Sequence, residues 1–294
     1  MNRVANSNAE RQPAILGENI VNTLQSVVRS KEAGYAPVNG LNMYYEITGD
    51  GEPLIYIPAA FAFSGITDFP ELAKRWRVVQ VDLQGHGHTA DIDRSLSFDQ
   101  HVRDVVALMQ HLKIERANFF GWSYGGLISM LIAMRHPERV SRVATYGSLF
   151  GAPQDAIRPE MFGPPVEQVP DGAAHQFARD HYKRVAPYPD HWPSIWKKLM
   201  DIAPHEFTRE QLASVKRRVL VALGDNDFIR LEHALYAYST IPDAELAVIP
   251  DATHFLLYDR PWKLEPVVAE FFAAPEERLP LGTIATGYQP GKTR

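Results

Sequence analysis

Short apolar, β-branched runs alternate with longer segments of helical periodicity through most of this chain, and this alternation restricts its fold more than any other feature. Parallel strands need long crossover connections, which are usually helices. The order therefore predicts an α/β protein with a mostly parallel sheet that is covered by helices on both faces. The strands that we expect are residues 41–48, 54–57, 77–83, 117–122, 140–146, 219–223 and 246–249.

Apolar residues at helical spacing predict five helices between these strands. In the clearest of them, residues 98–112, Ser97 can cap the first turn. A second, residues 124–135, should end before His136-Pro137, because proline disfavours a helical conformation in the residue before it. The other three are residues 69–76, 231–238 and 262–272.

Residues 150–214 break the alternation. They contain nine prolines and many large aromatic side chains but no convincing core strand. A long insertion with helical pieces predicts a helical lid that follows the sixth strand of the sheet and covers its carboxyl edge, where ligands of such sheets bind. The alternative is a packing layer that touches no ligand.

The two ends of the chain are expected to lie outside the sheet domain, whose core we assign to residues 36–149 and 215–274. Residues 1–35 form an N-terminal extension, in which apolar positions between Ile15 and Val28 predict an amphipathic helix rather than a secretory signal. That helix could dock on the protein body or bind a membrane surface or partner. Residues 275–294 are rich in Pro, Gly and Thr, which predicts a C-terminal tail.

Composition excludes several classes of function. The chain has no cysteine, so a thiolate nucleophile or a thiolate metal site is ruled out. Its formal charge is -5 without a long basic block, which argues against a nucleic-acid partner. No apolar stretch approaches the ~20 residues that span a bilayer. We therefore expect a soluble, cytoplasmic protein that acts on a small molecule.

The sequence Gly121-Trp122-Ser123-Tyr124-Gly125-Gly126 lies where a predicted strand meets a predicted helix. Gly-x-Ser-x-Gly in this setting is typical of a nucleophile elbow, a strained turn that lifts the serine hydroxyl above the sheet. The small residues are needed because a Cβ atom at either glycine would clash with the nearby chain. At a helix N-terminus, the N–H of Tyr124 could stabilise an oxyanion.

A serine nucleophile needs a base and a carboxylate that orients the base. His254 follows the strand predicted at 246–249, while Asp225 and Asp227 follow the strand at 219–223. The order serine, aspartate, histidine is the one expected for this elbow. Should neither aspartate serve, Asp155 is the nearest candidate after the strand at 140–146.

With these motifs, the sequence resembles the α/β-hydrolase superfamily, in its serine-nucleophile, esterase- or lactonase-like branch, over roughly residues 37–273. The turn Asp82-Leu83-Gln84-Gly85-His86-Gly87-His88-Thr89 and the loop Gly224-Asp225-Asn226-Asp227 are also similar to family motifs. The resemblance implies an eight-stranded, mainly parallel sheet with a helical cap. It also implies that the acid is Asp227, with Asp225 left as a turn residue.

One segment departs from the family pattern. Many members carry His-Gly after the third strand, where a backbone N–H completes the oxyanion hole, whereas this chain reads Ile57-Pro58-Ala59-Ala60-Phe61. Proline has no N–H to donate. Ala60 matches the usual donor position, and Phe61 is the fallback donor.

The resulting hypothesis is a serine hydrolase without metal or cofactor that cleaves an ester or lactone of a small to medium, largely apolar substrate. Ser123, Asp227 and His254 would be catalytic, and the N–H groups of Ala60 and Tyr124 would form the oxyanion hole. The same residues leave open a C–C bond hydrolase, an amidase or peptidase, a cofactor-free perhydrolase, or a receptor that turns over slowly. The side chains expected to contact the substrate are Phe61, Trp122, Trp192 and Trp196.

Overall fold

The computed structural model describes residues 32–161 and 173–278. The amphipathic helix expected between Ile15 and Val28 and most of the C-terminal tail lie outside the described residues. Eight strands form one sheet in the order β1-β2-β4-β3-β5-β6-β7-β8. β1 and β2, and β2 and β4, pair antiparallel, while every other pair is parallel. The mostly parallel, eight-stranded sheet predicted from the sequence is therefore confirmed.

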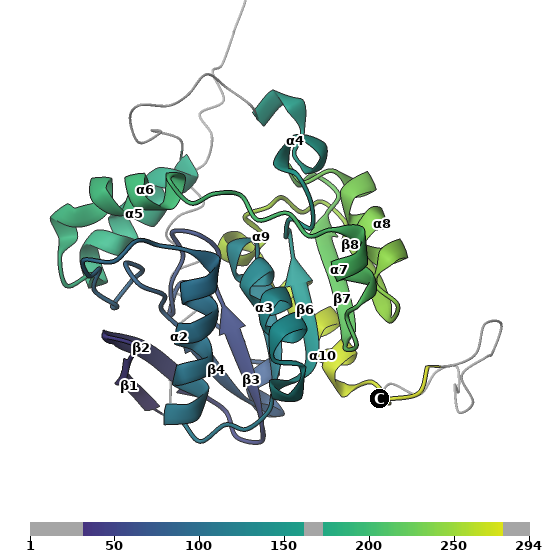
Figure 1. Ribbon diagram of the computed structural model, residues 1–294, viewed down its shortest axis with the longest axis horizontal. Helices are drawn as coiled ribbons and strands as arrows, with labels where there is room; N and C mark the ends of the chain where they lie inside the picture. Colours follow the sequence, from purple (N-terminus) through teal and green to yellow (C-terminus); the bar gives the residue numbers. More distant parts are fainter. Residues whose placement is uncertain (1–31, 162–172, 279–294) are drawn as a thin grey trace, which may run out of the picture.

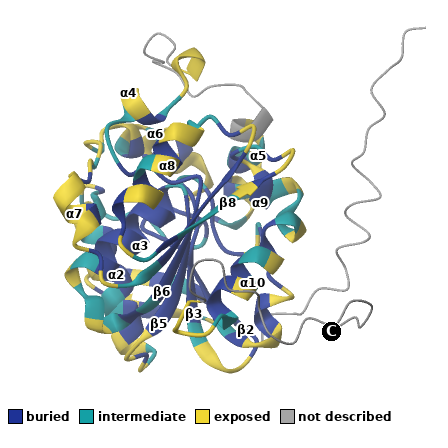
Figure 2. Cartoon of the chain, turned by 90° about the vertical axis from the view of Figure 1, so that its right-hand side faces the viewer, coloured by how far each residue is buried: buried dark blue, intermediate teal, exposed yellow. Residues whose placement is uncertain are grey.

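Helices cover both faces of this sheet (Figure 1). One apolar layer lies between the sheet and helices α2, α3 and α8, and a second lies between the sheet and helices α9 and α10. Figure 2 shows the strands as a buried slab between these layers. Elements in the first half of the chain are β1 (Glu32–Val38), β2 (Leu41–Thr48), β3 (Glu52–Ile57), β4 (Trp76–Val81), α2 (Phe98–His111), β5 (Ala117–Trp122), α3 (Tyr124–Arg135) and β6 (Val140–Tyr146). Those that close the domain are β7 (Arg218–Gly224), α8 (Leu231–Thr240), β8 (Ala244–Ile249), α9 (Leu256–Asp259) and α10 (Glu265–Ala273).

Strand β1 was not predicted. It forms the edge of the sheet, and only two of its seven residues, Ala36 and Val38, are buried. Most of this strand lies within residues 1–35, the segment assigned from the sequence to the N-terminal extension.

Two predicted helices differ from the structure. Residues 69–76 form only a short 3-10 turn at Leu72–Lys74, because Trp76 already begins strand β4. The helix expected over 262–272 is a 3-10 turn at Pro261–Lys263 followed by α10, which has Pro266 in its first turn, where the missing N–H costs no helical hydrogen bond. Ser97 caps α2 as predicted, since its Oγ accepts the Gln100 N–H at 3.2 Å.

The insertion after β6 contains the helices α4 (Pro153–Ala156), α5 (Ala173–Val185), α6 (Trp192–Met200) and α7 (Arg209–Ala213). Figure 1 shows α5 and α6 near the end of the sheet toward which β6 points, which is the carboxyl edge of the parallel strands. Among the described helices, none is long and apolar enough to cross a membrane.

Candidate active site

Ser123 occupies a strained turn between β5 and α3. Its backbone has φ 52° and ψ −111°, a conformation that non-glycine residues rarely adopt. A Cβ atom at Gly121 would overlap the main chain of Gly125, and one at Gly125 would overlap the carbonyl oxygen of Ile57. The two glycines of the motif therefore allow the helix to start directly against the neighbouring strands, with Ser123 at its N-terminus.

Three side chains from separate loops form a hydrogen-bonded chain. His254 Nε2 lies 2.9 Å from Ser123 Oγ, and His254 Nδ1 lies 3.0 Å from Asp227 Oδ1. Asp227 follows β7 and His254 follows β8, so the sheet carries all three to its carboxyl edge. An ionised carboxylate only accepts hydrogen bonds, which assigns the imidazole proton to Nδ1 and leaves Nε2 to accept the serine O–H.

Surrounding groups fix the imidazole in this orientation. The ring of Phe228 lies 3.9 Å from the His254 ring between centroids, and the indole Nε1 of Trp122 donates to the His254 carbonyl oxygen at 2.9 Å. The hydroxyl of Tyr146 donates to the Thr253 carbonyl oxygen at 2.6 Å. Trp122 is 1% exposed and packs with the layer beneath α9 and α10, so its contact supports His254 and gives no surface to a substrate.

The candidate oxyanion donors lie beside the elbow. Within the described chain, the N–H groups of Ala60, Phe61 and Tyr124 donate to no protein acceptor, while the Ala62 N–H donates to the Ala59 carbonyl and closes a turn around Ala60 and Phe61. Phe61 has φ 66°. These free donors are the groups that an oxyanion would need.

Aromatic side chains of the insertion cover this turn. The Phe61 ring stacks on Trp196 at 4.6 Å and contacts Trp192 at 5.3 Å between centroids. Both tryptophans belong to α6, so three of the four side chains that we expected to contact the substrate lie together in one aromatic cluster.

The comparisons with known proteins agree with this architecture. A family model described as the alpha/beta hydrolase fold matches residues 66–192. Serine hydrolase BPHL from Homo sapiens is 24% identical over 239 residues, which cover 74% of this chain and 79% of that protein. Pimeloyl-[acyl-carrier protein] methyl ester esterase from Aliivibrio fischeri is 36% identical over 110 residues, or 36% of this chain and 40% of that protein.

The structure of a meta-cleavage product hydrolase from Pseudomonas fluorescens superposes with a TM-score of 0.66 at 22% identity and covers 83% of this chain and 98% of that chain. The protein therefore has the α/β-hydrolase fold. In the α/β-hydrolase pattern, the loop after β7 carries the acid, and this loop holds two aspartates.

Asp225 has a local structural role in this loop. Its Oδ1 accepts the Ala252 N–H at 3.1 Å, and hydrogen bonds from the main chain of Asp251 and Ala252 lower the pKa of its carboxyl. The side chain that reaches His254 is Asp227, whose Oδ1 also accepts the Ile229 N–H at 2.9 Å. The geometry therefore favours Asp227 as the acid.

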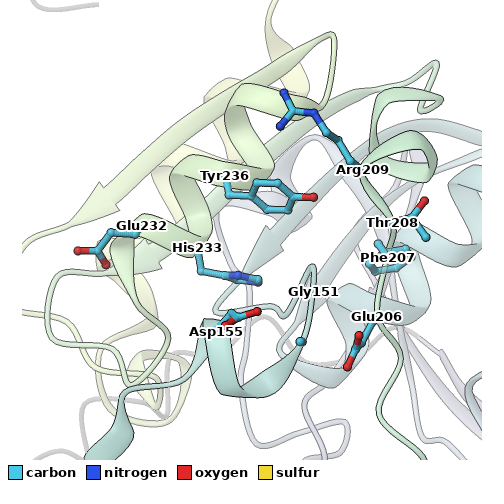
Figure 3. Close-up of a pocket in the computed structure, with 10 residues that line it drawn as sticks. Gly151, Asp155, Glu206, Phe207, Thr208, Arg209, Glu232, His233 and Tyr236 are labelled. Carbon is cyan, nitrogen blue, oxygen red and sulfur yellow. The ribbon is translucent and has the colours of Figure 1, made fainter.

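Asp155, the third candidate acid, lies elsewhere. It lines a cavity of about 420 Å³ between α4, the segment before α7, and α8 (Figure 3). His233 forms one wall of this cavity, and its Nε2 accepts the Phe150 N–H at 2.8 Å, while burial lowers its pKa to about 4. None of Ser123, Asp227 and His254 lines this cavity, so Asp155 is not placed to orient the base.

Gly147 was missed by the sequence analysis. It follows β6 with φ 58°, and a Cβ atom there would lie 2.8 Å from His254 Nδ1 and 2.9 Å from Asp227 Oδ2. The side chains of His254 and Asp227 therefore lie directly against the Cα atom of this residue. A glycine at the carboxyl end of a core strand, next to the strand that leads to Ser123, was the available signal.

The family turn after β4 supports the site rather than forming it. Asp82 Oδ1 accepts the Ser64 N–H at 2.6 Å, and Asp82 Oδ2 accepts the His88 N–H at 2.8 Å. This carboxylate thus ties the turn at residues 82–89 to the loop that contains Ala60 and Phe61. Among the described residues, no group of three or more His, Asp or Glu side chains could hold a metal ion.

Proposed function

We propose that this protein is a serine hydrolase that cleaves a carboxylic ester or lactone of a small to medium, largely apolar substrate through an acyl-enzyme on Ser123. The observation that carries the proposal is the hydrogen-bonded chain from Ser123 Oγ through His254 to Asp227, with the serine at a strained helix N-terminus. This arrangement activates a hydroxyl that is otherwise a weak nucleophile.

The proposed reaction proceeds in two halves. His254 Nε2 takes the proton of Ser123 as Oγ attacks the substrate carbonyl, and Asp227 stabilises the imidazolium that forms. The N–H of Tyr124 and one from the turn at Ala60 and Phe61 hold the oxyanion. His254 then gives its proton to the leaving alkoxide. Water, activated by the same imidazole, attacks the acyl group and restores the free serine.

An apolar substrate is favoured by the surfaces around Ser123. Phe61, Trp192 and Trp196 form an aromatic cluster above the oxyanion turn, and Phe228 packs on the base. Such side chains bind hydrocarbon groups and exclude water from the reacting centre. The partial similarity to a methyl ester esterase supports an ester as the scissile bond.

Turnover of a panel of p-nitrophenyl esters and lactones of increasing acyl length, at catalytic enzyme concentration, tests the proposal. We expect multiple turnovers, and we expect Ser123→Ala to lower kcat by about 10³-fold or more without loss of fold. A single burst without turnover would indicate a receptor. Hydrolysis of a meta-cleavage dienoate but of no ester would instead assign the protein to C–C bond hydrolysis.

A further inference from the structure

Phe61 has a backbone conformation that needs support from its surroundings. Its φ of 66° lies in the left-handed region, where a bulky aromatic residue is strained. Such strain persists only where neighbouring groups enforce it, and it is concentrated at functional sites.

The contacts come from α6 of the insertion. Trp196 stacks on the Phe61 ring with an interplanar angle of 13°, and Trp192 packs on the same ring at 50°. Trp192 is itself 2% exposed and held by Tyr182 at 5.3 Å. The Phe61 ring is therefore fixed by two indoles of one helix.

Helix α6 is in turn attached to the sheet domain at two other points. Ile195 packs so closely on Gly85 that a Cβ atom there would lie 2.6 Å from its Cδ1. Lys198 Nζ donates to Asp91 Oδ2 at 2.7 Å. The position of the two tryptophans is therefore set by the core and not by Phe61 alone.

Fixing the Phe61 ring also fixes the oxyanion turn. The angle φ is the rotation about the N–Cα bond of Phe61. It relates the orientation of the Phe61 side chain to that of the planar peptide group between Ala60 and Phe61, which carries the Phe61 N–H. Among the described residues, no protein group accepts the N–H of Ala60 or of Phe61. The turn is anchored on one side at Ser64 by Asp82. The other side leads to Ile57 and Pro58, whose carbonyl groups lie against Gly125 of the elbow.

We propose that Trp196 and Trp192 are positioning residues for catalysis: they hold Phe61 in its left-handed conformation and so aim the oxyanion donors of the turn at the elbow. The insertion would then complete the oxyanion hole in addition to covering the substrate. This inference rests on the proposed function, because it assigns a role in the same acyl transfer.

The first test is the Trp196→Ala variant with p-nitrophenyl acetate, whose acyl group is too short to depend on a long apolar wall. We expect kcat to fall about 10- to 100-fold with KM nearly unchanged, because an oxyanion donor acts on the transition state and not on the bound ester. Tyr188→Ala, which removes an exposed aromatic ring from the same insertion, is the matched control and should leave kcat unchanged. Equal effects of both variants, or a change in KM alone, would overturn the proposal.

The second test uses glycine at position 61, which adopts a positive φ without support. In the Phe61→Gly background, Trp196→Ala should lower kcat less than about 3-fold. A loss as large as in the wild-type background would show that Trp196 acts by another route. Trp196→Phe, which keeps a stacking ring, should recover most of the wild-type kcat, and failure of this variant to do so would also count against the proposal.

Phosphorylation of Ser123 by diethyl p-nitrophenyl phosphate separates this inference from the proposed function. The serine oxygen forms a bond to phosphorus and p-nitrophenolate leaves, so the step needs the triad and the oxyanion hole but no ester substrate. If the wild-type protein is phosphorylated but cleaves no ester, the proposed substrate class is wrong. The rate of phosphorylation of the same variants then takes the place of kcat, and a rate for Trp196→Ala equal to that of the wild type would overturn the role of Trp196. If Ser123 is not phosphorylated at all, both proposals fail.

Discussion

Asp227 is almost completely buried, and its two carboxylate oxygens have different surroundings. Oδ1 accepts hydrogen bonds from His254 Nδ1 and the Ile229 N–H, whereas Oδ2 has no hydrogen-bond partner among the described residues and lies above Gly147. Because few hydrogen-bond donors contact the Asp227 carboxylate, its negative charge is available to stabilise an imidazolium at His254.

Replacement of each aspartate in this loop by asparagine should therefore have unequal effects. We expect Asp227→Asn to lower kcat by up to about 10⁴-fold, because an amide favours the wrong imidazole tautomer and removes the charge. Asp225→Asn should change kcat only slightly, since Asp225 holds a turn at Ala252. Steady-state kinetics of both variants would decide, and the reverse ranking would move the acid to Asp225.

Gly147→Ala should damage catalysis more than stability. The added Cβ would push on His254 Nδ1 and Asp227 Oδ2, and a small displacement of a catalytic group can lower kcat by about 100-fold. Gly65→Ala is the matched control, because Gly65 also has a positive φ but faces open space. Both variants should lose about 1 kcal/mol in urea unfolding. Equal kcat values for the two would show that Gly147 is not needed for the site.

At the scale of residues, much of this site could be predicted. Ser123, Asp227 and His254 each lie at a motif after a strand, and the structure brings their side chains into hydrogen-bonding distance, although their catalytic roles stay a prediction. Trp122 could not be placed correctly. Its position next to Ser123 in the motif does not indicate that its side chain packs in the layer beneath α9 and α10. Gly147 has no side chain, so no functional group in the sequence marks it as part of the site.

At the scale of elements, the sequence predicted strands better than connections. Strands β2, β5 and β6 begin and end where predicted. Strands β5 and β6 are buried along almost their whole length, as is typical of central parallel strands, whereas β2 alternates between buried and more exposed positions, as is typical of an antiparallel strand. Edge strand β1 has little buried surface, so its sequence carries almost no pattern. The segment before β4 has apolar residues at helical spacing, but these pack against α10 as a short turn.

Helix α10 is joined to that turn by Glu265, which gives a pH-dependent contribution to stability. Its Oε1 accepts the N–H groups of Glu71 and Leu72, and burial raises its pKa from 4.5 to about 7. A group whose pKa is raised in the folded state stabilises the fold when protonated. This contribution is complete below pH 4.5 and is lost as pH rises through 7.

The free energy of unfolding of the wild-type protein, relative to that of Glu265→Gln, should therefore decrease between pH 4.5 and 7. The glutamine keeps an acceptor oxygen for the two N–H groups but cannot ionise. Urea unfolding of both proteins across this range measures the difference. A constant difference between them would show that Glu265 titrates at an ordinary pKa in the folded protein.

At the scale of the whole molecule, the fold brings together groups that are far apart in the chain. Ser123 and His254 are separated by 131 residues, and they meet because β5 and β8 are parallel strands whose carboxyl ends share one edge. The insertion reaches the same edge through α6, and its aromatic side chains contact the turn after β3. Its place along the chain could be predicted, but its contact with Phe61 depends on tertiary packing that no local pattern records.

The central claim is that Ser123 carries the acyl group during turnover. Acid quenching during steady-state turnover of a p-nitrophenyl ester, followed by intact-protein mass measurement and peptide mapping, tests it directly. We predict one added acyl mass, located on Ser123, and no adduct or turnover with Ser123→Ala. An acyl group on another residue, or undiminished turnover by Ser123→Ala, would contradict the account.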